Sequence, residues 1–104
     1  MSSPTQRSKA HLEKQGYRVA IVEHWNAFAR IRQDLFGIVD LLCLRGTETL
    51  AVQTTSASNM SARVKKIAES DAIADIRAAG WGFHVHGWRK GANGRYVLRK
   101  IDVS

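Results

Sequence analysis

The fold is decided at residues 36–44, FGIVDLLCL, where Asp40 is the only charged residue in an otherwise apolar run. Such a run predicts a central strand that is covered on both faces of a sheet. Residues 45–48, RGTE, are a plausible hairpin turn, and residues 50–55, LAVQTT, follow as the partner strand. The register of this hairpin places Asp40 directly opposite Gln53 on one face of the sheet.

The sequence on either side of this hairpin predicts helices and further strands. A capping box at Ser3 to Gln6 begins the first helix, and Gly16 ends it. Residues 26–34 fit either a loop or a helical turn. The predicted elements are helix 4–15, strand 17–25, strand 36–44, strand 50–55, helix 60–79 with a candidate break at Ser70-Asp71, strand 81–88 and strand 95–103. The order α-β-β-β-α-β-β indicates an α/β fold with a central mixed sheet flanked by helices.

Length and charge limit the class of protein. The 104 residues are enough for a single domain, residues 1–104. The 16 Lys and Arg residues outnumber the 9 Asp and Glu residues, for a net charge of +7. From residue 76 onward the sequence has six basic residues and one acidic residue, Asp102. A polyanion such as nucleic acid is therefore the expected partner.

Compartment and membrane association are also addressed by the sequence. Cys43 is the only cysteine and lies in the apolar run, which is typical of a core residue in a reducing, intracellular (cytoplasmic) setting. The first 15 residues are polar and lack the apolar segment of a secretion signal. No stretch approaches the roughly 18 apolar residues of a membrane span. We expect no membrane association.

Asp40 is the most informative residue, because burying an ionised carboxylate costs several kcal/mol unless a partner compensates it. Two interpretations remain open at this point. A buried hydrogen bond between Asp40 and Gln53 is one. The other is shared coordination of Mg²⁺ or Mn²⁺, since Gln53 offers an amide oxygen and Thr55 lies one pleat further on the same side.

The string from Asp34 to Leu42, followed after a hairpin by residues 50–55 and then a basic helix, resembles the PD-(D/E)XK nuclease superfamily. The likeness is greatest to small stand-alone domains of the Holliday-junction-resolvase-like and VRR-NUC-like kind, which are often phage-borne. It covers most of the chain and implies a restriction-endonuclease-like αβββαβ core. It further implies cleavage of DNA with a divalent ion, and pairing of two chains as a homodimer.

The resemblance assigns roles residue by residue. Asp40 is similar to the metal-binding aspartate of the motif, Gln53 takes the position of its second acid, and Thr55 takes the position of its lysine. Glu23 resembles an additional acidic residue that some members contribute. Asp34 is a further candidate ligand. The implied metal ligands are therefore Asp40, Gln53, Glu23 and Asp34.

Two departures from the motif bear on activity. Gln53 lends a dipole where relatives lend a charge, and Thr55 cannot stabilise developing negative charge as an ammonium would. Some members carry the lysine on the following helix, where Arg63 and Lys66 share one face here. Either cation therefore has two candidate roles, assistance to catalysis by Lys66 or Arg63 and contact with DNA from the helix surface.

Two weaker signals concern nucleic acid. Basic residues flank the glycine-rich turn at 91–94 and fit either phosphate contacts or a solvated turn; they are Arg89, Lys90 and Arg95. The three tryptophans fit either base stacking or the core; they are Trp25, Trp81 and Trp88.

The sequence thus predicts a metal-dependent endonuclease for duplex or branched DNA. The variant motif favours an alternative, a DNA-binding module that keeps the nuclease fold with an impaired site. A third hypothesis, a protein-interaction domain on the same scaffold, applies if DNA binding is absent.

Overall fold

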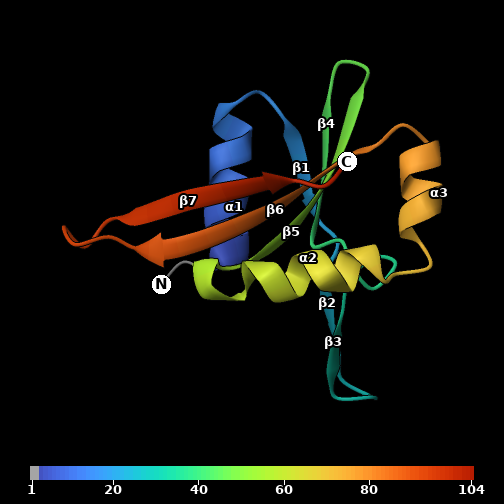
Figure 1. The fold of residues 1–104 in the computed structure, drawn as a ribbon, viewed down its shortest axis with the longest axis horizontal. Helices are drawn as coiled ribbons and strands as arrows, with labels where there is room; N and C mark the ends of the chain where they lie inside the picture. Colours follow the sequence, from blue (N-terminus) through green and yellow to red (C-terminus); the bar gives the residue numbers. More distant parts are fainter. Residues whose placement is uncertain (1–2) are drawn as a thin grey trace.

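The computed structural model describes residues 3–104 and shows an α/β fold built on a five-stranded mixed sheet (Figure 1). The elements in chain order are α1 Pro4–Lys14, β1 Arg18–Ile21, β2 His24–Asn26, β3 Ile31–Gln33, β4 Leu41–Arg45, β5 Glu48–Ser56, the 3-10 turn η1 Ala57–Asn59, α2 Met60–Ala68, α3 Ile73–Ala78, β6 Gly82–Lys90 and β7 Tyr96–Asp102.

The sheet has the strand order β1-β4-β5-β6-β7. Strands β1, β4 and β5 are antiparallel neighbours, β6 runs parallel to β5 after the crossover through η1, α2 and α3, and β7 returns antiparallel to β6. The predicted hairpin is confirmed, since β4 is interior and Leu41 lies opposite Val52. The sheet is therefore mixed, as its sequence pattern indicated.

The prediction of a strand over the whole of residues 36–44 is wrong in its first half. Phe36 and Gly37 have left-handed φ angles of 56° and 77°, and the chain turns there before β4 begins at Leu41. Ile38 and Val39 are apolar because they insert into the core, with exposed fractions of 2 % and 0 %. An apolar run records burial, and burial in a turn looks the same as burial in a strand.

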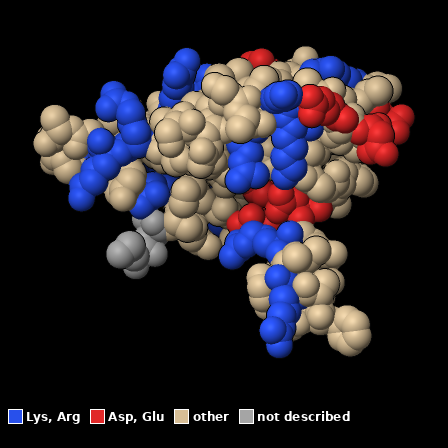
Figure 2. Space-filling model, turned by 60° about the horizontal axis from the view of Figure 1, so that its bottom comes forward, with Lys and Arg blue, Asp and Glu red and all other residues tan. Residues whose placement is uncertain are grey.

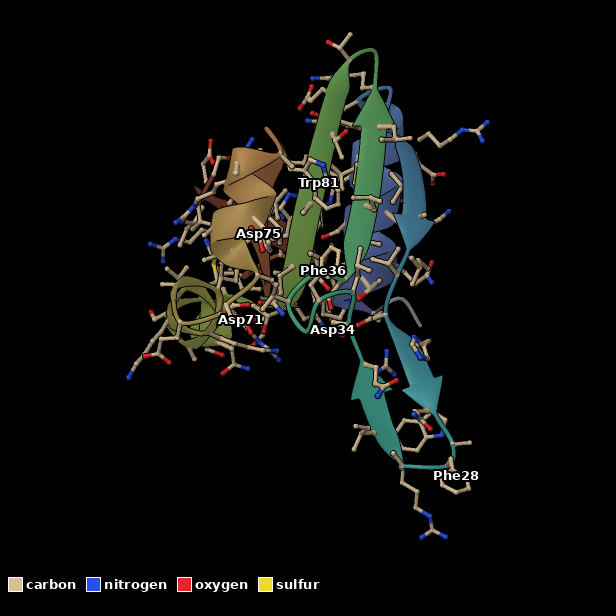
Figure 3. All side chains as sticks on the ribbon, turned by 90° about the vertical axis from the view of Figure 1, so that its right-hand side faces the viewer. Phe28, Asp34, Phe36, Asp71, Asp75 and Trp81 are labelled. Atoms are coloured by element: carbon tan, nitrogen blue, oxygen red, sulfur yellow. The ribbon has the colours of Figure 1, made fainter. Side chains whose placement is uncertain are left out.

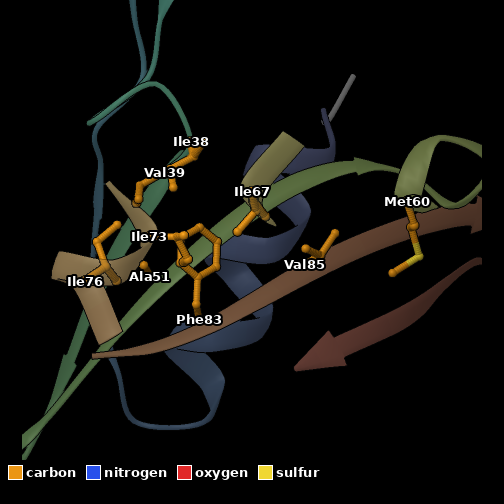
Figure 4. Packing of buried hydrophobic residues seen from close by; sticks show 9 residues of the cluster. All are labelled: Ile38, Val39, Ala51, Met60, Ile67, Ile73, Ile76, Phe83 and Val85. Carbon is orange, nitrogen blue, oxygen red and sulfur yellow. The ribbon is translucent and has the colours of Figure 1, made fainter. Parts of the chain in front are cut away.

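Two apolar layers cover the two faces of the sheet. On one face, helices α2 and α3 pack against Ala51, Phe83 and Val85 (Figure 4). On the other face, Leu12 of α1 packs against Leu41, Cys43, Leu50 and Val52. Helix α1 thus lies on one face of the sheet, and α2 and α3 lie on the other.

The first helix follows its prediction closely. The Ser3 hydroxyl caps the helix by accepting a hydrogen bond from the Gln6 N–H at 3.2 Å. Gly16 has a φ of 92°, and its N–H bonds to the Glu13 carbonyl while the Tyr17 N–H bonds to Leu12. These bonds end the helix in the left-handed turn for which glycine is suited.

The predicted strand at residues 17–25 is in fact two strands that belong to different sheets. Strand β1 ends at Ile21, and β2 then pairs with β3 in a separate two-stranded hairpin. Of the loop or helical turn expected at residues 26–34, only residues 27–30 form a turn, because Asn26 ends β2 and β3 occupies residues 31–33. We call residues 24–33 the arm, since this hairpin projects from the body of the molecule (Figure 1).

The second half of the chain agrees with its prediction. The helical stretch divides into α2 and α3 around Ser70 and Asp71, and Gly80 follows α3 with a φ of 79°. Strands β6 and β7 form the expected terminal hairpin. Within residues 3–104, no helix is both long enough and apolar enough to cross a membrane.

Candidate functional site

Three carboxylates converge where the arm joins the body. Glu23, Asp34 and Asp40 each offer an oxygen, and these oxygens all lie within 4.8 Å of one another. Glu23 immediately precedes β2, Asp34 immediately follows β3, and Asp40 immediately precedes β4. The hairpin of the arm therefore brings the first two acids together, and the start of β4 supplies the third. We call these three residues the acidic cluster.

Asp40 is held in place by both its backbone and its side chain. Its N–H bonds to the Val52 carbonyl at 3.0 Å, and its carbonyl accepts from the Val22 N–H at 2.9 Å. Its Oδ2 accepts from the Thr54 N–H at 2.7 Å and from the Thr54 hydroxyl at 3.3 Å. Asp40 thus contacts the residues on both sides of Gln53, and its carboxylate is fixed by Thr54 rather than by the Gln53 amide.

Glu23 is tied to the body through helix α1. Its Oε1 accepts from the Thr5 hydroxyl at 2.8 Å and from Arg32 Nη1 at 3.2 Å. The Thr5 and Thr54 hydroxyls are themselves 2.8 Å apart. Since the Thr54 N–H already holds Asp40, the Thr54 hydroxyl can donate to Thr5 while Thr5 donates to Glu23, so hydrogen bonds link the two carboxylates through two threonines.

Asp34 lies beside a cation on helix α2, the ammonium of Lys66. Lys66 Nζ lies 3.9 Å from Asp34 Oδ2, and the lysine side chain is 44 % exposed. Asp34 and Lys66 both line an open cleft of about 700 Å³. Lys66 is thus the predicted cation that the structure places beside the acidic cluster, on the following helix.

Arg63 lies one turn earlier on α2 and lines a second cleft of about 340 Å³. Glu23 and Thr55 line the same cleft, and Arg32 lines both clefts. Figure 2 shows acidic side chains gathered where the arm meets the body, with Lys and Arg side chains around them. Asp34 and Glu23 can therefore each be approached from an opening that carries basic residues, whereas the buried Asp40 lines neither cleft.

Burial and the neighbouring carboxylates both act on the pKa of Asp40, and burial has the larger effect. Burial raises the pKa of Asp40, and the charges of Asp34 and Glu23 raise it further, from 3.8 to about 7, against the lowering effect of the Thr54 hydrogen bond. Three carboxylates this close favour either a shared proton or a bound cation. Glu23, Asp34 and Asp40 are therefore the residues that could hold a divalent cation.

Gln53 is another buried polar residue at this end of the sheet. It is fully buried, and within residues 3–104 neither its Oε1 nor its Nε2 has a hydrogen-bond partner. An amide in this state costs about 1–3 kcal/mol for each unsatisfied group. Thr55 is also buried, with 6 % of its surface exposed. No hydrogen bond joins Gln53 to the three carboxylates, so the structure gathers Glu23, Asp34 and Asp40 more closely than the predicted set.

The basic residues of the terminal hairpin form a separate group. Arg89 and Lys90 end β6, Arg95 precedes β7, and all three are exposed. None of them lines either cleft beside the acidic cluster. They are available for a polyanion at the end of the sheet but do not take part in the candidate site.

Sequence reasoning missed three residues of the site, Thr5, Arg32 and Thr54. Thr5 is in the first turn of α1 and meets Glu23 only through the tertiary packing of that helix. Arg32 is placed by the unforeseen hairpin of the arm. Thr54 could have been found, because a buried aspartate before a strand needs a donor, and the backbone of the neighbouring strand is the nearest source.

The residues present fit a hard divalent cation. Carboxylate oxygens are the preferred ligands of Mg²⁺, and Mn²⁺ accepts the same donors. The cluster groups three of the nine acidic residues in a chain of net charge +7. No family model, curated protein or solved structure matches this chain. Function must therefore be argued from the site itself.

Proposed function

We propose that the protein is a divalent-metal-dependent nuclease that hydrolyses phosphodiester bonds in duplex or branched DNA. The observation that carries the proposal is the acidic cluster with Lys66 beside it, set in a strongly basic chain. A bound Mg²⁺ or Mn²⁺ would supply Lewis-acid chemistry and activate water for attack on phosphorus. The protein would supply the ligands, the orientation and a cation.

Individual residues have distinct roles in this proposal. Asp40 is the central ligand, fixed by Thr54, and Glu23 and Asp34 complete the carboxylate set. Lys66 occupies the place of the ammonium that Thr55 cannot provide, and it offers charge to the phosphate undergoing attack. Gln53 contributes an unpaired amide oxygen as a neutral auxiliary ligand.

The order of elements supports the same proposal. Leaving out the arm, the chain runs α1, β1, β4, β5, α2 with α3, then β6 and β7. This order is compatible with the restriction-endonuclease-like αβββαβ core, followed by one additional strand. The arm is then an insertion between the first two strands of that core.

A DNA substrate is favoured by charge, and a homodimer by the need to cut two strands. Exposed or half-buried basic side chains lie on α2 near the acidic cluster and on the terminal hairpin; they are Arg63 and Lys66 on α2, and Arg89, Lys90 and Arg95 on the hairpin. The buried thiol of Cys43 fits a reducing, intracellular setting for this activity. Two copies would place one acidic cluster against each strand of the substrate.

A second candidate function is a DNA-binding module with an impaired site. The observation that favours it is the neutral pair Gln53 and Thr55, both buried where the motif has an acid and a lysine. Such a module would bind DNA without cutting it, and its acidic cluster would serve only to orient the arm.

Incubation with DNA separates the two candidates. Branched, duplex and single-stranded DNA are each incubated with the protein and Mg²⁺ or Mn²⁺, alongside Asp40→Asn and the matched control Asp71→Asn, whose side chain is exposed and outside the cluster. The nuclease proposal predicts cleavage by wild type and Asp71→Asn and none by Asp40→Asn. Binding without cleavage in all three proteins would establish the binding module, and cleavage by Asp40→Asn would refute the proposed site.

A further inference from the structure

The arm exposes three large apolar side chains to solvent. Trp25, Phe28 and Ile31 have exposed fractions of 59 %, 102 % and 50 %. Phe28 lies at the tip, pointing away from the body (Figure 3). An isolated two-stranded hairpin gains little from such residues in water, and exposed apolar groups concentrated on one element mark an interaction surface.

The charge of the arm indicates what this surface meets. Residues 24–33 contain Arg30, Arg32 and His24 and no acidic residue. Trp25 and Arg32 are paired across the two strands, so their side chains lie on the same face of the arm. Because the interiors of protein interfaces are depleted in charge, and the arm carries basic residues beside its apolar ones, a polyanion with exposed aromatic rings complements the arm better than a second copy does.

The tip of the arm has a defined shape rather than an irregular one. The Asn26 side chain accepts hydrogen bonds from the N–H groups of Phe28 and Ala29, both at 3.0 Å. Arg30 then adopts a left-handed φ of 56°, which closes the turn into β3. The turn therefore presents the Phe28 ring and the Arg30 guanidinium from one short loop.

We propose that the arm is a DNA-binding wedge, in which Phe28 stacks on an unpaired base or between two base steps while Arg30 contacts a neighbouring phosphate. Apolar side chains inserted in this way unstack and bend nucleic acid, and stacking on aromatic rings requires no particular base. The inference rests on the proposed nuclease function and adds to it a preference for DNA that is branched, bulged or easily unstacked.

The position of the arm connects this contact to the acidic cluster. Glu23 and Asp34 flank the two ends of the arm, and Arg32 on β3 bonds to Glu23. Phe28 is five positions after Glu23, so their Cα atoms are at most about 18 Å apart at about 3.6 Å per residue. A Cα separation of this size corresponds to about five nucleotides at about 3.4 Å each. The wedge would therefore set which phosphate reaches the acidic cluster.

The test uses duplex DNA with a single unpaired 2-aminopurine, whose fluorescence reports stacking, and the same duplex without the bulge. The variant Phe28→Ala is compared with wild type, with Arg30→Gln, and with the control Leu44→Ala, which removes an exposed apolar side chain from β4. We expect Phe28→Ala to bind bulged DNA about tenfold more weakly and to lose the fluorescence change. Leu44→Ala should match wild type. Because Phe28 contacts solvent on all sides, its truncation leaves the core intact.

Two results would overturn the wedge. Equal affinity and equal fluorescence change for wild type and Phe28→Ala would remove the arm from DNA binding and leave the proposed nuclease function standing. The second result would come from sedimentation without DNA. If wild type is a dimer and Phe28→Ala is a monomer, the arm is a contact between copies. Failure of wild type to bind any DNA at low salt would instead refute the proposed function and the wedge together.

Discussion

Replacing Asp40 by Asn should stabilise the metal-free protein, and the gain should grow with pH. Asp40 is 4 % exposed, and burial together with Asp34 and Glu23 raises its pKa from 3.8 to about 7. The folded chain therefore holds a proton that the unfolded chain has released between about pH 4 and pH 7. The stabilisation that this retained proton provides is fully present below about pH 4 and is lost as pH rises towards 7.

The magnitude follows from the same pKa. A change from 3.8 to about 7 corresponds to about 4 kcal/mol, at about 1.4 kcal/mol per pH unit. About 1 kcal/mol of this stabilisation is already lost at pH 4.5, and the remaining roughly 3 kcal/mol is lost between pH 4.5 and pH 8. Asn keeps an oxygen to accept the Thr54 N–H but has no charge. The advantage of Asp40→Asn over wild type should grow by about 3 kcal/mol across this interval.

Urea unfolding at pH 4.5 and pH 8 in the presence of a chelator measures this advantage. Asp71→Asn is the control, since it removes an exposed carboxylate outside the cluster and should show no comparable growth. A difference between Asp40→Asn and wild type that is the same at both pH values would show that the pKa of Asp40 is not raised in the folded chain. Greater stability of wild type at pH 8 would mean that the Asp40 carboxylate is charged and compensated in the folded chain.

Three further predictions concern other parts of the site. Gln53→Met should raise the free energy of unfolding by about 1–2 kcal/mol, because it removes a buried amide whose Oε1 and Nε2 are unpartnered, and a loss of stability in urea unfolding would show that the amide is paired. Thr5→Val should lower it by about 1–2 kcal/mol, because the buried hydroxyl bonds to both Glu23 and Thr54, and an unchanged urea midpoint would contradict the hydrogen-bond chain. Lys66→Gln should weaken DNA binding and reduce the magnitude of the slope of log K against log salt by about 0.9, whereas Lys14→Gln on α1 should leave that slope unchanged. Fluorescence anisotropy titrations over a salt series measure both slopes. Equal slopes for the two variants would contradict the contact between Lys66 and DNA.

The centre of the fold could be predicted because its signals are local. The turn at residues 45–48 fixes the register of β4 and β5, so the placement of Leu41 opposite Val52 followed from spacing alone. Helix α1 carries its stop signal, Gly16, within its own sequence. Elements whose boundaries depend on capping and short turns can be inferred without knowing the rest of the chain.

The remainder depends on tertiary structure. The arm has short strands of three residues and no core of its own, so its pattern was too weak to distinguish a hairpin from a loop. Asp40 could be singled out as a buried acid, but the approach of Asp34 depends on how β3 returns to the body. The unpartnered amide of Gln53 is a property of packing, and residue order does not show it.

Calorimetric titration with Mn²⁺ at pH 7.5 tests the central claim, that Glu23, Asp34 and Asp40 together hold a divalent ion. Wild type, Asp40→Ala and Asp71→Ala are titrated side by side, with the fold of each checked by circular dichroism. We expect one Mn²⁺ site in wild type and Asp71→Ala, accompanied by proton release from the cluster, and no binding by folded Asp40→Ala. Equal binding in all three proteins, or no binding in wild type, would contradict it.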